Sequence, residues 1–224
     1  MQQPPARGGL ALMPLAAASF VTAALAGRFL HGVAPRIPIG IGMIAIAAGS
    51  VLLYFEITAG AHVADLVPGL ILIGIGVGLA TPVVVSAAVG TLPRHQAGAA
   101  GGVVNTFRQL GLTLGIAVFG VVFGGPAVSV LTASHQVPDP HGIASALTSG
   151  AAQHVLAAVP AAHRAQAAEL FRHAFASGLD RVYLWCAVAA AVGGVLVLAL
   201  ARQRAVTHEP APAPREPEAT PVEV

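Results

Sequence analysis

The sequence predicts an all-α, polytopic membrane helix bundle. Only 9% of its 224 residues are charged and 56% are hydrophobic, whereas about a quarter of the residues of a soluble domain are charged. Five segments remain apolar over the roughly 20 residues that a helix needs to cross a bilayer. These predicted spans are residues 8–27, 37–55, 66–91, 105–126 and 182–201.

The first span also has features of a secretory signal. Arg7, in the lead-in 1–7, precedes an apolar stretch that ends in an Ala-Leu-Ala sequence at 24–26, a pattern typical of a cleavage site. However, Pro14 interrupts the stretch, and its length equals that of the later spans. We therefore favour a first membrane helix.

Arginines between the spans predict the orientation of the chain. Arg28 and Arg36 flank the first loop, Arg94 lies in the third loop, and two more arginines follow the last span. Short loops rich in arginine stay in the cytoplasm. We expect a multi-pass protein of the inner (plasma) membrane, with a transmembrane domain over 8–204 and its C-terminus in the cytoplasm.

Two segments fall outside the predicted spans. The outer loop, 131–181, contains apolar residues at helical spacing after residue 160, which predicts an amphipathic helix. That helix either lies on the membrane surface or packs on the rest of the protein, and the sequence around Gly178 is expected to end it. Residues 205–224 are rich in proline without apolar periodicity, so we predict a disordered cytoplasmic tail.

Several function classes are disfavoured by composition. The eleven basic residues are all arginine and are spread thinly, unlike the clustered basic face of a nucleic-acid-binding protein. The single cysteine, Cys186, cannot form an internal disulfide or a cysteine-only metal site. Nine histidines and the i, i+4 pair of Glu169 and His173 match no zinc signature. We expect no enzyme activity, cofactor, metal or nucleic-acid partner.

Three polar side chains stand near the start of the fourth span. Asn105, Arg108 and Gln109 are spaced i, i+3, i+4, so a helix places them on one side. If the helix begins at Asn105, Arg108 lies about one turn from its cytoplasmic end, where it can snorkel to water. Arg108 is then either an anchor for the helix end or a functional group, and the residues alone leave both open.

Glycines recur at spacings that favour close helix packing. In the third span they include Gly74 and Gly78, and in the fourth Gly111 and Gly115. Small residues at this spacing let helix backbones approach each other. The pattern predicts tight packing in a bundle, or helices that slide against each other, with Pro82 bending the third span.

The segment 74–120 resembles the late part of the fourteen-helix drug:proton antiporters of the major facilitator superfamily. The family's "P-x-x-x-x-G" loop is found at Pro93 and Gly98, and its "N-T-x-R-Q-L-G-x-x-x-G" helix entry runs from Asn105 through Arg108 and Gln109 to Gly115. Of the family's basic loop after the first helix, three positions match, at Gly27, Arg28 and Arg36. His31 stands where the family has an acid, and Gly32 where it has a second basic residue.

The resemblance implies part of the C-terminal half of a multidrug efflux transporter, with only its last five helices. Such a transporter exports a small apolar, cationic or neutral, drug-like compound in exchange for protons by alternating access. The matching residues would organise the cytoplasmic gate, whereas the residues that contact substrate cannot be named. No acid lies inside a predicted span, so the segment would be inactive unless a missing N-terminal half complements it. The alternative is a stand-alone membrane scaffold, or a homo-oligomer with a pore.

Overall fold

A computed structural model describes residues 9–30, 32–57, 64–90, 93, 96–134, 139–160 and 162–200. The regular elements of this described part are helices, which confirms the predicted all-α class. In chain order they are α2 (Met13–Phe29), α3 (Arg36–Glu56), α4 (Val67–Gly90), α5 (Ala97–Ala133), α6 (Pro140–Thr148), α7 (Ala152–Ala158) and α8 (Arg164–Leu200).

Four of these helices, α3, α4, α5 and α8, are long and apolar enough to cross a membrane. The chain is therefore a multi-pass membrane protein. The sequence predicted five spans, and the helix at the first of them, α2, is shorter, at 17 residues. Pro14 explains its start, because proline has no N–H to donate and is favoured in the first turn of a helix.

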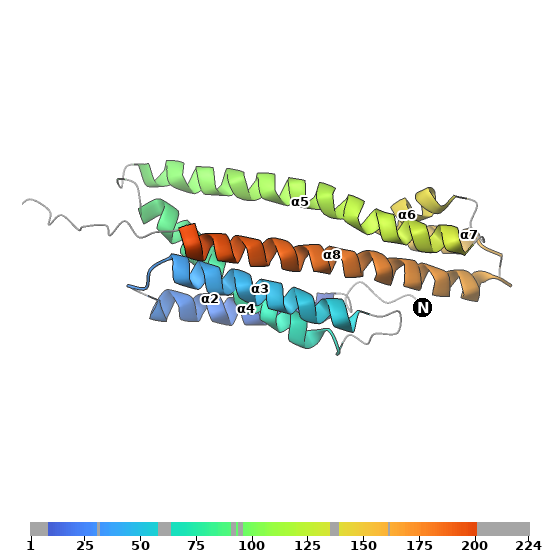
Figure 1. Cartoon of the computed structure of the whole chain (residues 1–224), viewed down its shortest axis with the longest axis horizontal. Coiled ribbons are helices and arrows are strands. Elements are labelled where there is room, and N and C mark those ends of the chain that lie inside the picture. The colour runs from blue at the N-terminus through green and yellow to red at the C-terminus, as the bar shows by residue number, and fades with distance from the viewer. Residues whose placement is uncertain are drawn as a thin grey trace, which may run out of the picture.

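The long helices are arranged as a row of neighbours (Figure 1). Helix α2 packs on α4, α4 on α3, α3 on α8, and α8 on α5, and α4 also contacts α5 directly. Helices α6 and α7 adjoin α5 and α8 at one end. We call that end the outer end of the molecule and the opposite end the inner end. The α2–α3 connection, the start of α5 and the end of α8 all lie at the inner end.

Glycines bring α4 close to both of its neighbours. A Cβ atom at Gly42 of α3 would lie 2.7 Å from the carbonyl oxygen of Gly76, and one at Gly49 would lie 2.8 Å from that of Gly69. Both distances are too short for any side chain. The two helices therefore touch backbone to backbone at two levels, which only glycine permits.

Helices α5 and α8 are longer than the sequence predicted. Each has 37 residues, or about 55 Å at 1.5 Å per residue. Helix α5 extends the predicted span 105–126 at both ends, and α8 joins the predicted amphipathic helix to the span 182–201. The predicted helix end at Gly178 is wrong: Gly178 is buried inside α8, and a Cβ atom there would lie 2.7 Å from the ring of Phe123.

The outer parts of α5 and α8 form a small unit with α6 and α7, which we call the outer subdomain. Its core consists of large and small apolar side chains from three helices: Phe123, Ala127, Leu131, Ala144, Leu147, Phe171 and Ala174. The predicted amphipathic segment of α8 therefore packs on the protein. The Arg164 guanidinium donates to the carbonyls of Ala157 and Val159, at 3.3 and 3.1 Å, and so fastens the end of α7 to the start of α8.

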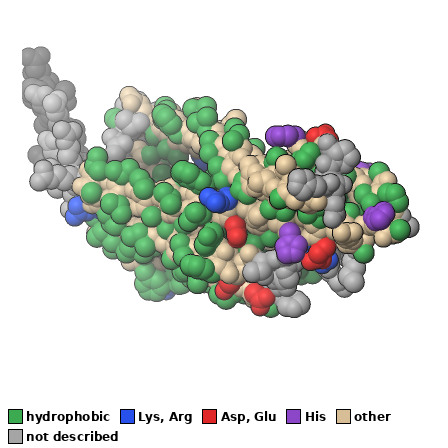
Figure 2. Space-filling model, turned by 45° about the vertical axis from the view of Figure 1, so that its right-hand side comes forward, with side chains coloured by type: hydrophobic (Ala, Val, Ile, Leu, Met, Phe, Trp, Pro, Cys, Tyr) green, Lys and Arg blue, Asp and Glu red, His purple; other side chains and the backbone are tan. Residues whose placement is uncertain are grey.

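The two parts of the molecule differ in surface character. Figure 2 shows hydrophobic side chains covering the bundle, whereas histidines and carboxylates gather toward the end that carries the outer subdomain. An apolar surface suits lipid and a polar one suits water. The surface pattern thus agrees with a bundle in the bilayer and an outer subdomain beyond it.

Candidate site at the inner ends of α4 and α5

A cavity of about 450 Å³ lies between the inner half of α4 and the inner part of α5. It contains two of the three polar residues that the sequence singled out, Asn105 and Arg108. The remaining walls are apolar except for one hydroxyl side chain, and they consist of Ala80, Thr81, Val84, Val85, Gly101, Val103, Val104 and Phe107.

Arg108 lies deeper along its helix than the sequence indicated. Helix α5 begins at Ala97, not at Asn105, so Arg108 is about three turns, or about 16 Å, from the helix start. The added residues, 97–104, are all alanine, glycine or valine, and the stretch contains no proline to stop a helix. The α4 residues across the cavity lie about 8 to 15 Å from the end of α4 at Gly90.

The guanidinium of Arg108 meets no counter-charge within the described part of the chain. Its side chain is exposed, as are those of Asn105 and Gln109, and no carboxylate lines the cavity. By contrast, the Thr106 hydroxyl donates to the Gly102 carbonyl at 3.0 Å within the helix. An arginine at membrane depth faces a protein interior or a water-filled space and pairs with acids or carbonyls. The cavity is therefore suited to a polar or anionic group that this part of the chain does not supply.

The other predicted gate residues lie at the inner end but do not line the cavity. Pro93 accepts a hydrogen bond from the Gln96 N–H at 2.8 Å, which forms the turn into α5. Gly98 follows in the first turn of α5. Gly27 and Arg28 close α2, and Arg36 opens α3. His31 and Arg94 lie outside the described residues.

The four glycines predicted to pack helices fall into two groups. Cβ atoms at Gly74 and Gly78 of α4 would overlap the carbonyl oxygens of Leu15 and Ser19 of α2. In the described structure, a Cβ atom at Gly111 would meet nothing within 4 Å, and one at Gly115 only the ring of Phe119, one turn along the same helix. The close contact expected at Gly111 and Gly115 is thus not made within this part of the chain.

Sequence reasoning missed the α4 wall of the cavity. Thr81, Val84 and Val85 carry no local signature, because apolar walls of binding sites resemble any apolar helix. One signal was available in Pro82, which lies within this wall, between Thr81 and Val84. Proline removes the hydrogen bond to the carbonyl four residues earlier and so loosens the helix at this level.

Two carboxylates, Asp180 and Glu56, lie on the membrane-length helices α8 and α3. Asp180, assigned to the outer loop from the sequence, lies inside α8, and Glu56 ends α3. Each has one buried oxygen atom without a hydrogen-bond partner among the described residues. Both lie near the level of a buried cluster, Leu53, Ile57 and Leu70, that joins the outer ends of α3 and α4 to α8.

Histidines of the outer subdomain lie apart from this cavity. Glu169 bonds to Arg172, and its other oxygen lies 3.5 Å from Nε2 of His173, on an exposed face of α8. Among the residues that the structure describes, no group of three or more His, Cys, Asp or Glu side chains is arranged to hold a metal. His135 lies outside the described residues.

Curated proteins similar to this chain are named as transporters and drug-resistance proteins. The "Probable actinorhodin transporter" of Streptomyces coelicolor is 32% identical over 133 residues, which are 58% of this chain and 23% of the relative. "Multidrug resistance protein Stp" of Mycobacterium tuberculosis is 30% identical over 166 residues, 71% of this chain and 30% of the relative. The chain resembles a segment of major facilitator drug transporters.

A third relative extends this major facilitator resemblance over most of the chain. "Multidrug efflux pump LfrA" of Mycolicibacterium smegmatis is 28% identical over 198 residues, 88% of this chain and 38% of the relative. The chain thus spans about a quarter to two fifths of the length of the curated relatives it matches. No family model matches the chain. No solved structure matches it either.

Proposed function

We propose that this chain is the C-terminal membrane part of a proton-coupled multidrug efflux transporter. It would export small apolar compounds, cationic or neutral, by alternating access. The observation that carries the proposal is Arg108, an arginine on the apolar, membrane-length helix α5 that lines a cavity between α5 and the proline-bearing α4. Relatives named as drug transporters support it.

The cytoplasmic gate is the role proposed for this cavity. In this role Asn105 and Arg108 bond to a polar group on a neighbouring helix when the inner side is closed. Gln109 lies on the same side of α5 and extends that polar surface. Helix α5 packs more extensively on α8 than on α4, and the cavity separates α4 from α5 near their inner ends. We therefore expect the contact between α4 and α5 to open without disturbing the core of the bundle.

Proton coupling would require helices that the matched region of the relatives does not include. The cavity holds no carboxylate, whereas a proton-driven antiporter needs a buried acid that takes up and releases the proton. The chain would therefore be inactive without a complementing half. Glu56 and Asp180, each with one unpartnered buried oxygen, are the acids of the described part best placed to assist.

Replacing Arg108 tests this proposal. In a strain without other efflux pumps, Arg108→Ala in the native gene product should reduce ethidium efflux to the level of cells lacking the gene. Membrane insertion, measured by immunoblotting of isolated membranes, should be unchanged. Arg172→Ala is the matched control, since Arg172 is exposed on the outer subdomain, and it should transport normally. Unchanged efflux in Arg108→Ala would contradict the proposed gate.

The native size and orientation can be measured with one antibody against the tail, residues 205–224. A native product of about twice the 22.3 kDa of this chain would support a complete transporter, and one near 22.3 kDa would require a partner chain. In the proposed orientation, the tail faces the cytoplasm of an inner-membrane protein. It should then resist protease in intact spheroplasts and be digested in inverted vesicles.

A homo-oligomeric scaffold or pore is the second candidate. The observation that favours it is the open glycine face of α5, where Cβ atoms at Gly111, Gly120 and Gly124 would meet nothing within 4 Å in the described structure. Such a face can receive a second helix closely. Gly111→Cys combined with Cys186→Ala should form a disulfide between copies if α5 pairs with itself, and the absence of this cross-link would exclude that pairing.

A further inference from the structure

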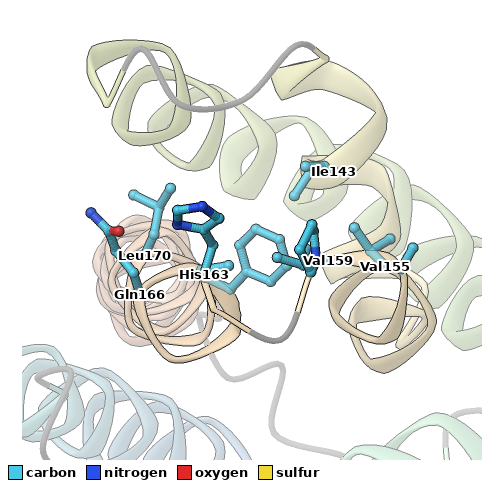
Figure 3. Close-up of a pocket in the computed structure, with 10 residues that line it drawn as sticks. Ile143, Val155, Val159, His163, Gln166 and Leu170 are labelled. Atoms are coloured by element: carbon cyan, nitrogen blue, oxygen red, sulfur yellow. The ribbon is translucent and has the colours of Figure 1, made fainter.

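The outer subdomain contains a second and larger cavity, of about 760 Å³. It lies between α6, α7 and the start of α8, and Figure 3 shows side chains from all three segments bordering one space. Sites for drug-sized molecules have volumes of about 300 to 1,000 Å³. The cavity is therefore large enough for such a molecule, and six of its lining residues are Ile143, Val155, Val159, His163, Gln166 and Leu170.

The chemistry of the lining selects the kind of molecule that fits. Its walls are apolar except for two side chains, His163 and Gln166, each of which can donate and accept hydrogen bonds. No carboxylate is among the lining residues. A cation would therefore lose hydration without gaining a counter-charge, whereas an uncharged apolar molecule would bury its surface and retain one or two hydrogen bonds.

The position of the cavity along α8 favours an occupant other than the acyl chains of the bilayer. The outer ends of α3 and α4 meet α8 at the level of Ala176, Leu179 and Tyr183. The α8 wall of the cavity runs from Gln166 to Phe171, which places it about 8 to 15 Å farther along the helix. The cavity thus lies beyond the end of the shorter helices, which in the proposed orientation is the side where an exported compound would leave.

We propose that this cavity binds an uncharged, mostly apolar, drug-sized molecule. The identification of this molecule as an efflux substrate rests on the proposed transport function, whereas the binding site itself does not. His163 provides its main polar contact. The imidazole lies in the space between α8 and α6, and the backbone N–H of His163 donates to the Pro160 carbonyl at 3.0 Å, which holds the main chain at this position.

Protection of an introduced cysteine tests the site directly. The full chain with Cys186→Ala and Val159→Cys is purified in lipid nanodiscs. The rate at which a maleimide alkylates the introduced cysteine is measured with and without Nile red, an uncharged aromatic probe. At a free probe concentration about ten times its Kd, occupancy should slow alkylation about tenfold. Ethidium, a cation of similar size, should slow it less than about twofold at the same concentration. Ser149→Cys, which does not line the cavity, should react at the same rate with either probe.

Further variants keep the test decisive. His163→Ala should weaken protection by Nile red at least about threefold, consistent with the loss of one hydrogen bond, and His163→Gln should restore most of it. If Val159→Cys does not fold, Val155→Cys reports on the same space. Equal rates with and without Nile red would overturn the site, and equal protection by ethidium would overturn the choice of an uncharged ligand. Normal efflux together with no protection would reject this cavity alone and leave the proposed transport function standing.

Discussion

The bundle of α2, α3 and α4 and the outer subdomain are held together in opposite ways. In the bundle, glycine backbones meet directly, as at Gly42 and Gly76. In the outer subdomain, large side chains such as Phe123, Leu131 and Phe171 fill the space between helices, with relative exposures of 6%, 0% and 6%. One chain thus uses the smallest residues in one region and some of the largest in the other.

The solvent predicted for each region, lipid for the bundle and water for the outer subdomain, accounts for this difference. Lipid tails are as apolar as leucine, so burying a large side chain between membrane helices gains little, and close backbone packing is favoured instead. In water, each fully buried leucine or phenylalanine stabilises the fold by about 1.5 to 3 kcal/mol. The boundary between the two regions, near Ala176 on α8, marks the place where the favoured packing changes.

Phe123→Ala should give the largest effect and should be confined to the outer subdomain. The ring packs edge-on against Phe175, with centroids 5.4 Å apart, and covers Gly178. Removing such a buried ring costs about 3 to 5 kcal/mol. Hydrogen exchange in α6 and α7 should accelerate while exchange in α3 and α4 stays slow. Phe107 on the same helix is 70% exposed, so Phe107→Ala should change exchange in neither region. Equal effects of the two variants would show that the outer subdomain does not depend on large buried side chains.

Gly76→Leu should destabilise the bundle and spare the outer subdomain. Its side chain would collide with the backbone oxygen of Gly42, which cannot rotate away, so the expected cost is about 3 kcal/mol. Thermal unfolding in detergent can be followed by the labelling of Cys186, the single cysteine, which is half-buried in α8. Gly111→Leu serves as the control because its position is open. A bundle that tolerates Gly76→Leu as well as Gly111→Leu would show that backbone contact is not what holds it.

Asp139→Ala should produce the smallest change, at the start of α6. The Asp139 carboxylate accepts a hydrogen bond from the Gly142 N–H at 2.9 Å and caps the helix. Loss of an N-cap costs about 1 kcal/mol, so exchange of the first α6 amides should rise about fivefold, and Asp139→Asn should preserve the cap. No change in either variant would mean that α6 is held only by its packed face.

The sequence predicted the bundle better than the outer subdomain, and Gly178 shows why. Long apolar runs indicate membrane helices almost by themselves, so the predicted span 37–55 lies within one residue of α3 at both ends. Gly178 was expected to end a helix, as glycine often does. Its role is to admit the ring of Phe123 from a helix that is distant in sequence, and local patterns contain no information about that partner.

The candidate site was predictable on one side only. Helical spacing placed Asn105 and Arg108 on a common face, and both line the same cavity. The opposite wall from α4 and the true depth of Arg108 depended on where α5 starts and on which helix lies next to it. The pairing of α4 with α5 at this level is a tertiary contact between apolar surfaces. Such surfaces have no distinctive sequence pattern, so the pairing could not be predicted.

The buried residues of α5 give the helix the mechanics of a lever. Apart from Ala100, they are Phe123, Ala127 and Leu131, all in its outer third. Helix α5 is therefore held mainly at its outer end, and the helix between Ala97 and Phe123 is about 39 Å long. A tilt of about 5° about that outer end would displace the inner tip by about 3 Å. The outer subdomain is thus a fulcrum, and its rigidity sets how far Arg108 moves for a given rotation.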